Sequence, residues 1–185
     1  MKADTALLDD VRRMNGDALT RIFDLYAPAI YWYALCLCND AVMADHIVGD
    51  VFTKLLEHLS AGNGPRSNLR SYLFEMAYHV LVDEVRYSYR RVPIDEVEFT
   101  LRAGYSTPVS VEKQILLETV SQAIQNDLTE DQRHVIILRF LEGFSLNETA
   151  SIMGKKAGAV KVMQHRAIAA LRKSLDYPLA ETYIV

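Results

Sequence analysis

The segment from Lys155 to Leu175 contains six lysines and arginines and no acid, although the whole chain has a formal net charge of −4. Its apolar residues recur at three- and four-residue steps, which predicts a helix with one buried stripe. Cations opposite such a stripe suit the phosphate backbone of DNA, and the N-terminal end of the helix can approach the major groove. The predicted stripe is Val160, Met163, Ala167, Ile168, Leu171 and Leu175, and the side chains expected outside it are Lys161, Gln164, His165, Arg166 and Arg172.

The residues before this basic helix support DNA binding. Ser145 and Glu148 have the spacing of a capping box that opens a short helix to Met153, and Gly154 stands where a C-cap glycine is expected. The basic helix then runs over about 157–174. A short helix, a glycine turn and a longer basic helix are the sequence form of a helix-turn-helix. A lone basic helix would instead favour a solvated surface helix.

A second set of cations is interleaved with tyrosines between residues 66 and 91. Such a mixture fits single-stranded DNA, because cations follow the backbone and rings stack on unpaired bases. Tyr72 also belongs to the apolar face of its predicted helix, so a core role is an equally good interpretation. The residues are Arg66, Arg70, Arg86, Arg90 and Arg91, with Tyr72, Tyr78, Tyr87 and Tyr89.

Enzyme chemistry has weaker support. Two histidine–aspartate pairs lie one helical turn apart and could bind a metal, but neither has the HExxH form and no third ligand is identifiable. Cys36 and Cys38 diverge on a helix, which favours a core or surface role. Nucleophile-elbow, phosphate-loop and dinucleotide motifs are absent from the sequence. We therefore expect no enzyme activity, no metal and no cofactor. The two pairs are His46 with Asp50 and His79 with Asp83.

Helical spacing accounts for most of the remaining chain, and no strand pattern is present. Helices are expected over 4–14, 17–38, 69–91 and about 112–127, and Pro28 should kink the second of these. Two further helices begin at caps. Asp40 opens one whose apolar stripe spans 44–59, and Thr129 opens another, with Gln132 completing a capping box. The apolar stripe of the third helix includes Phe52 and Leu56. Residues 60–68 form a polar loop by composition.

The sequence thus predicts an all-α protein with two small helical domains, 1–92 and 112–175, joined by a flexible linker. The linker, 93–111, contains two prolines, a glycine and several acids, and residues 176–185 form a C-terminal tail. The N-terminus does not resemble a targeting peptide and no window approaches eighteen apolar residues. We expect a cytoplasmic protein without membrane insertion.

Two blocks of the chain resemble the extracytoplasmic-function class of bacterial RNA polymerase sigma factors. Residues 19–59 and 68–86 are similar to the family's region 2, and residues 128–175 are similar to its region 4. The second block is the more specific, with L-T-E-D-Q-R, S-L-N-E, A-x-x-M-G, G-x-V-K and R-A in order. The resemblance implies a region 2-like helical bundle, a region 4-like helix-turn-helix domain and a role in promoter-specific transcription initiation.

The resemblance also implies a role for each surface. The face bearing Asp45, Asp50 and Lys54 would dock on the clamp helices of the large subunit of the RNA polymerase core. The loop 62–68 and the helix after it would melt the minus-ten promoter element, and the basic helix would bind the minus-thirty-five element. The minus-ten residues are Arg66, Asn68, Arg70, Tyr72, His79 and Arg86. The minus-thirty-five residues are Lys161, His165 and Arg166, helped by Lys155 and Lys156.

The family usually has tryptophan at Tyr72 and asparagine at His79, and the change at His79 implies an altered base preference. The family resemblance further suggests control by an anti-sigma factor that clamps both domains and could hold the protein near the membrane. Two alternatives remain open. One is a stand-alone helix-turn-helix regulator with an N-terminal sensing or dimerisation domain, which binding to core polymerase would distinguish. The other is a helical metalloenzyme that uses the histidine–aspartate pairs.

Overall fold

The computed structural model describes residues 2–88 and 122–175, with side chains for residues 7–84 and 122–174. Every regular element within these two ranges is helical, as the sequence predicts. The predicted linker 93–111 and the tail 176–185 lie outside the described residues. The first range contains α1 (Lys2–Arg12), α2 (Gly16–Cys38), α3 (Ala41–Ser60) and α4 (Leu69–Ser88). The second contains a helical stretch over 122–127, then α6 (Glu130–Ile136), the π-helical turn η1 (Ile137–Leu141), α7 (Leu146–Ile152) and α8 (Ala157–Leu175).

The N-terminal helices begin at side chains that accept hydrogen bonds from the first turn. Asp40 caps α3 as predicted, and its carboxylate accepts from the backbone N–H of Val42 at 2.8 Å and of Met43 at 3.0 Å. The sequence placed the start of α2 at Asp17, but Asn15 is the cap and accepts from Ala18 N–H at 3.0 Å. Asparagine is among the preferred N-cap residues, and with Asn15 as the cap the helix starts at Gly16, one residue earlier than predicted.

Most of the predicted stripe of α3 is buried against α2 and α4. Leu56 is the exception, with 40% of its surface exposed. It follows the fully buried Leu55 by one residue, which turns it about 100° round the helix and away from the core. Phe52 is partly buried and packs on the ring of Phe23, with ring centroids 4.8 Å apart.

Both predicted capping boxes are present in the C-terminal part. Gln132 accepts from Thr129 N–H at 3.0 Å, and Ser145 and Glu148 exchange bonds at the start of α7. Gly154 has a φ of +60°, the left-handed conformation that ends α7 and turns the chain into α8. The turn η1 was not predicted. Its wider winding is seen in the bond from Glu142 N–H to Ile137 O, five residues back, at 2.9 Å.

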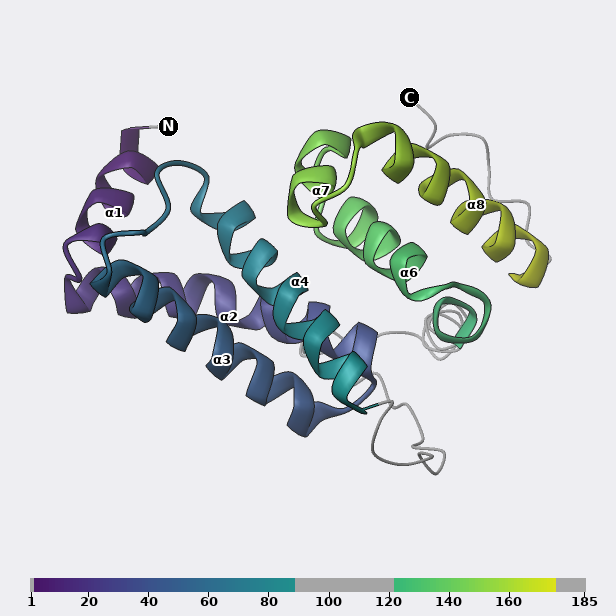
Figure 1. The fold of residues 1–185 in the computed structure, drawn as a ribbon, viewed down its shortest axis with the longest axis horizontal. Helices are drawn as coiled ribbons and strands as arrows, with labels where there is room; N and C mark the ends of the chain where they lie inside the picture. Colours follow the sequence, from purple (N-terminus) through teal and green to yellow (C-terminus); the bar gives the residue numbers. More distant parts are fainter. Residues whose placement is uncertain (1, 89–121, 176–185) are drawn as a thin grey trace, which may run out of the picture.

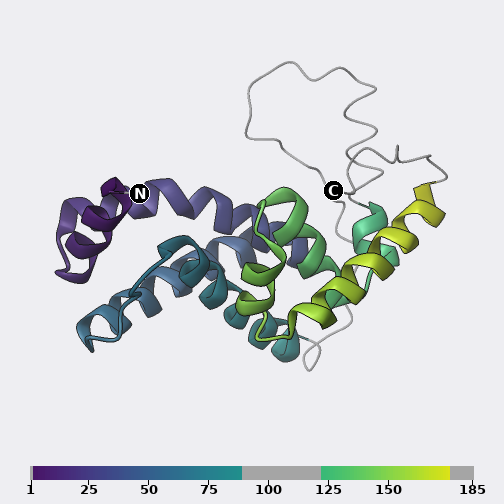
Figure 2. The ribbon, with the colours of Figure 1, turned by 90° about the horizontal axis from the view of Figure 1, so that it is seen from above.

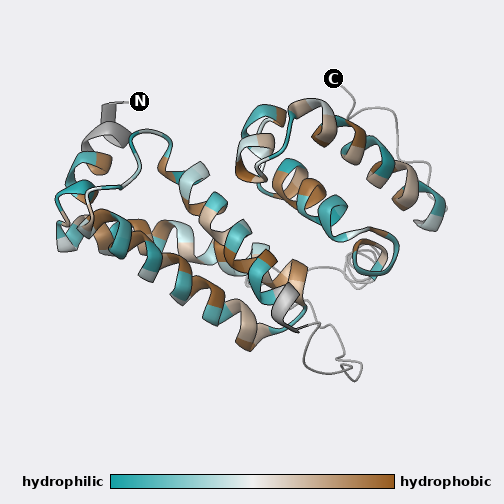
Figure 3. Ribbon diagram, viewed as in Figure 1, coloured by the Kyte–Doolittle hydropathy of each residue, from teal (hydrophilic) through white to brown (hydrophobic). Residues whose placement is uncertain are grey.

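The two helical groups pack against each other, with α7 beside α4 and α6 beside α2 (Figures 1 and 2). One apolar cluster runs through both, and it includes Tyr33 and Phe74 from the first group and Leu138 and Phe144 from the second. Apolar and polar residues alternate along each helix in the manner of amphipathic elements (Figure 3). The arrangement brings the start of α4 next to the turn between η1 and α7.

Candidate nucleic-acid interface

The basic side chains of α8 lie on the face opposite its buried stripe. Lys161, His165 and Arg166 are exposed. Val160, Ala167 and Leu171 are buried, as predicted, while Met163 and Ile168 are partly buried. The side chain of Leu175 lies outside the described residues. The capped α7, the turn at Gly154 and the exposed cations of α8 together form a helix-turn-helix.

The two lysines before α8 differ in their surroundings. Lys156 is exposed, whereas Lys155 is partly buried and its ammonium lies 3.0 Å from a carboxylate oxygen of Asp131 in α6. This ion pair joins the turn of the helix-turn-helix to the start of α6. Lys155 therefore has a structural contact in addition to the DNA contact that the resemblance implies.

Arg139 is a residue that sequence reasoning missed. Its guanidinium donates to Gln164 Oε1 in α8 at 3.0 Å and to the backbone carbonyl of Phe144 at 2.5 Å. It thereby holds η1, the start of α7 and α8 in a fixed relation. Its position in the middle of an apolar run was the available signal, since a buried cation needs partners.

The predicted minus-ten residues lie in the loop before α4 and along α4 itself. Arg66 and His79 are exposed. Tyr72 is partly buried, and its hydroxyl lies 2.6 Å from His58 Nδ1 and 3.4 Å from the carbonyl of Asn63 in the loop. Burial, and then the charge of Glu75, raises the pKa of Tyr72. Its hydroxyl holds the loop to α3 and α4, so this ring has a packing role whether or not it meets a base.

Replacing Tyr72 with phenylalanine separates these two roles. The ring remains, but the bonds to His58 and Asn63 are lost, so we expect the free energy of unfolding to fall by about 1 kcal/mol. Stacking of the ring on a base would persist. Urea denaturation measures the first effect and binding of single-stranded DNA the second. A variant as stable as the parent would show that the hydroxyl does not hold the loop.

Asn68 and Arg70 both bond to residues of the C-terminal part, although Asn68 remains exposed and Arg70 is partly buried. Asn68 has a φ of +41°, its Oδ1 accepts from Ser71 N–H at 3.1 Å, and its Nδ2 donates to Glu148 Oε1 at 3.2 Å. Arg70 donates to Glu142 Oε2 at 2.9 Å and to the Glu142 carbonyl at 2.6 Å. The side chain of Arg86 lies outside the described residues.

The acids at this contact have shifted pKa values. Burial raises the pKa of Glu142, and the bond and charge of Arg70 oppose that shift. Hydrogen bonds from Ser145 lower the pKa of Glu148, with a smaller contribution from Asn68. A raised pKa fits the carboxylate that has lost solvent, Glu142, and a lowered pKa fits the carboxylate that accepts several hydrogen bonds, Glu148.

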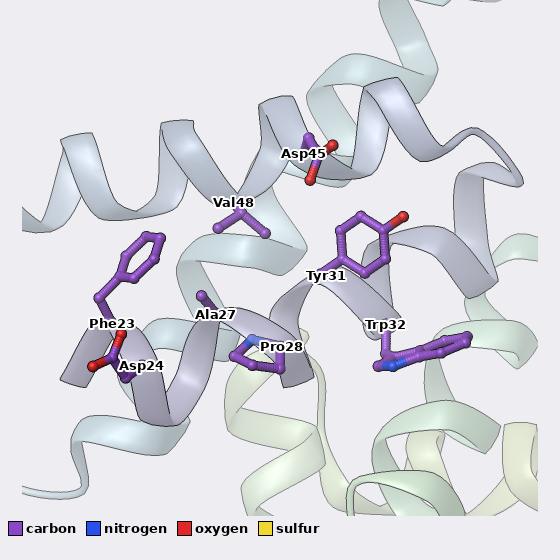
Figure 4. Close-up of a pocket in the computed structure, with 8 residues that line it drawn as sticks. All are labelled: Phe23, Asp24, Ala27, Pro28, Tyr31, Trp32, Asp45 and Val48. Atoms are coloured by element: carbon purple, nitrogen blue, oxygen red, sulfur yellow. The ribbon is translucent and has the colours of Figure 1, made fainter. Parts of the chain in front are cut away.

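The predicted polymerase-binding residues Asp45, Asp50 and Lys54 are all exposed on α3. Beside Asp45 lies a cavity of about 370 Å³ between α2 and α3 (Figure 4). Pro28 lies in its wall and has no N–H to donate to the carbonyl of Asp24, four residues earlier. The cavity is lined by Phe23, Asp24, Ala27, Pro28, Tyr31, Trp32, Asp45 and Val48. Its apolar wall was not predicted to be part of a site.

A buried polar contact joins the two helical groups. The Tyr33 hydroxyl lies 2.7 Å from His134 Nδ1, and the ring of Tyr78 packs edge-on to His134 with centroids 4.8 Å apart. Burial lowers the pKa of His134 to about 3, so the imidazole is neutral, and its Nδ1 shares a hydrogen bond with the Tyr33 hydroxyl. The residues stand 101 positions apart along the chain, and the sequence offered no signal for this contact.

Among the residues with described positions, no group of three or more histidine, cysteine or acidic side chains is arranged to hold a metal ion. None of the helices in these described ranges is both long and apolar enough to cross a membrane.

A helical bundle next to a helix-turn-helix with a basic second helix is an architecture of sigma-70 proteins, and two family models match it. Residues 22–91 match Sigma-70 region 2 and residues 126–173 match Sigma-70 region 4. The chain belongs to the extracytoplasmic-function class of RNA polymerase sigma factors. It is a DNA-binding transcription initiation factor, and the sigma family binds RNA polymerase and promoter DNA.

Several members of this class resemble the chain over most of its length. It is 27% identical over 173 residues to the sigma factor BldN of Streptomyces coelicolor, covering 91% of this chain but 64% of that protein. It is 26% identical over 164 residues to SigX of Bacillus subtilis, covering 84% of this chain and 82% of SigX. The sigma factor RpoE of Bartonella quintana, solved in complex with the anti-sigma factor NepR, has 25% identity and a TM-score of 0.70, covering 86% of this chain and 97% of that chain.

Proposed function

We propose that this sigma factor reads promoters with two surfaces, one on each helical domain. The exposed cations of α8 would bind the minus-thirty-five element, and the loop before α4 with the start of α4 would bind the minus-ten element. The observation that carries the proposal is the helix-turn-helix whose second helix exposes Lys161, His165 and Arg166 opposite a buried stripe. We retain the domain division at 1–92 and 112–175 as part of this proposal.

The polymerase core would dock on the exposed face of α3. Asp45 and Asp50 supply negative charge there, and the cavity beside Asp45 offers aromatic and apolar walls. A mixed surface of this kind suits a partner helix with apolar and basic residues, since the apolar contacts give affinity and the charges give orientation. The clamp helices of the large subunit are the proposed partner, with Lys54 at the edge of the contact.

Reversing one charge on this face tests the docking site. We expect Asp50→Lys to weaken binding to core polymerase about tenfold, because a favourable rim charge becomes a repulsive one. Asp10→Lys, on the exposed side of α1, makes the same charge change away from the proposed surface. Competition for core against a labelled sigma factor measures both. Equal affinities for the two variants would exclude Asp50 from the interface.

We further propose that an anti-sigma factor controls this protein. The support is the likeness to RpoE, which was solved with NepR and which matches this chain over both helical groups. The sigma factor proposed here would act in the cytoplasm, where polymerase and promoter meet. No catalytic step is required of it, because binding energy opens the duplex. The stand-alone regulator has no observation in its favour beyond the helix-turn-helix that both functions share.

Run-off transcription with purified bacterial core polymerase on a library of promoter fragments tests the proposal. Core alone is the baseline. Starts that require the protein and cluster at a defined set of promoters would support it and reveal the promoter elements. If the protein binds neither core nor promoter fragments in the presence of core, the proposed function is wrong.

A further inference from the structure

Two acids of the C-terminal domain bind two residues that the proposed function assigns to the minus-ten element. Glu142, directly after η1, accepts from Arg70, and Glu148, in the first turn of α7, accepts from Asn68. The Arg70 and Glu142 side chains are 36% and 13% exposed, so the carboxylate is largely enclosed. Arg70 and Asn68 therefore meet carboxylate oxygens at positions where DNA would offer phosphate oxygens or base edges.

Aromatic rings fix the guanidinium in this contact. Arg70 lies over the ring of Phe144 at 4.1 Å from its centroid and over Phe74 at 5.4 Å, and the two rings are 5.0 Å apart. Phe144 belongs to the C-terminal domain and Phe74 to α4. Cation–π contacts with these two adjacent rings, together with the bonds to Glu142, hold Arg70 in one orientation. Its guanidinium would have to leave this position to follow a DNA backbone.

We propose that Glu142 and Glu148 act as an intramolecular substitute for DNA, and that the contact they make with Arg70 and Asn68 keeps the free protein closed. In this closed form the two acids occupy hydrogen-bonding groups of Arg70 and Asn68, while Arg66 and His79 stay exposed. Opening frees the groups of Arg70 and Asn68 for DNA. This inference rests on the proposed minus-ten role of Arg70 and Asn68, while closure itself is a property of the free chain.

The same residues serve the closed form without weakening the fold of either domain. Glu148 accepts from Ser145 N–H through Oε2 and from Asn68 through Oε1, so its capping bond survives when Asn68 departs. Asn68 likewise caps α4 through Oδ1 and reaches Glu148 through Nδ2. Each domain can therefore separate with its helix caps intact, which is what a reversible contact requires.

Closure lowers the apparent affinity for DNA by the fraction of molecules that are open. A substitution that weakens closure should thus tighten DNA binding, although it replaces no predicted DNA-binding residue. Glu142→Gln keeps the size of the side chain and leaves the backbone carbonyl to Arg70, but removes the charge. We expect about fivefold tighter binding, since a bond between charged groups becomes a bond to a neutral acceptor.

The experiment uses the full chain and two readouts. Small-angle X-ray scattering reports the size of the free protein, and fluorescence anisotropy reports binding of a labelled single-stranded oligonucleotide of random sequence. Asp127→Asn is the matched control, because it removes one negative charge from an exposed position of the same domain. Glu148→Gln is a second variant. Glutamine completes a capping box as well as glutamate does, so α7 should remain folded.

The expected result is a larger radius of gyration and tighter oligonucleotide binding for Glu142→Gln than for Asp127→Asn, with Glu148→Gln between them. A Glu142→Gln protein with the size and affinity of the control would overturn the proposal. Expansion without any gain in affinity would show that closure does not compete with DNA. A failure in run-off transcription by the parent protein would count against the proposed function alone, because closure is read from the free chain.

Discussion

Reversal of two charges on α8, with Lys161 and Arg166 both replaced by glutamate, should reduce promoter-dependent transcription at least about a hundredfold. Each exposed cation that neutralises a phosphate releases a counterion, so its loss weakens binding and flattens the salt dependence. Glutamate adds repulsion from the same phosphates. Both positions lie opposite the buried stripe, so the fold should tolerate the change. Run-off transcription and the salt dependence of binding to a minus-thirty-five duplex measure the effect.

Arg172 and Lys173 provide the matched control on the same helix. Both are exposed in the last turn of α8, so their replacement by glutamate makes an identical change in net charge far from the end that we propose enters the groove. We expect that double variant to keep most of its activity. Equal losses for the two double variants would mean that α8 responds to net charge alone and does not dock by its N-terminal half.

Lowering the pH from 7.5 to 5 should open the closed form through His134. Burial is the main cause that lowers the pKa of His134 to about 3 from its usual 6.5. Neutral His134 favours the closed form, and this stabilisation is complete above pH 6.5, the usual pKa of histidine. It is lost as the pH falls from 6.5 toward 3, because protonation of His134 then favours the open form. The loss is about 1.4 kcal/mol for each pH unit, or about 2 kcal/mol at pH 5.

The groups around His134 fix the direction of this effect. Asp131 raises the pKa of His134, whereas Arg133 and Lys155 lower it further, and Tyr33 and Tyr78 face it from the other domain. Burial raises the pKa of Tyr33, so its hydroxyl stays protonated throughout this range. Glu142 also lies at this contact, where burial raises its pKa and the charge and hydrogen bond of Arg70 oppose that shift, so its protonation has to be separated from that of His134. The net effect therefore needs a variant that removes only the histidine.

His134→Gln supplies that comparison, because glutamine is polar and does not titrate. Small-angle scattering and urea denaturation at pH 7.5 and 5 should show a strong pH dependence for the parent and a weak one for this variant. The variant should be less stable than the parent at pH 7.5, since Tyr33 loses a buried partner of fitted shape. The same pH dependence in both proteins would assign the effect to carboxylates.

Local signals in the sequence predicted local features well. Asp40, Thr129 and Ser145 cap helices because their side chains satisfy backbone donors within three residues, and this chemistry needs no knowledge of distant parts. The stripes of α3 and α8 follow from the helical period in the same way. The exposed Leu56 shows the limit, since an apolar residue can stand beside a buried stripe without belonging to it.

The contacts between the helical groups could not be predicted from the sequence. Tyr33 and His134 each looked like an ordinary residue of an amphipathic helix, and only the packing of α2 against α6 makes them a pair. Arg70 was predicted as a DNA contact from its charge and position, but charge alone does not show that Glu142 lies within 2.9 Å. Its partner depends on η1, and the spacing of apolar residues along this segment does not distinguish a π-helical turn from ordinary α-helix.

The turn η1 gives the C-terminal domain a place that can absorb a change in length. A π-helical turn arises when one residue is inserted into an α-helix, and its removal restores ordinary winding. Losing a single residue between Ile137 and Leu141 should therefore leave the segment after the turn in nearly the same orientation relative to α6, whereas a deletion inside α6 would rotate that segment by about 100°. Glu142 would then still face Arg70 after a deletion in the turn but would point away from it after a deletion in α6. Among descendants of this sequence, single-residue deletions should therefore be tolerated far more often in the turn than in α6.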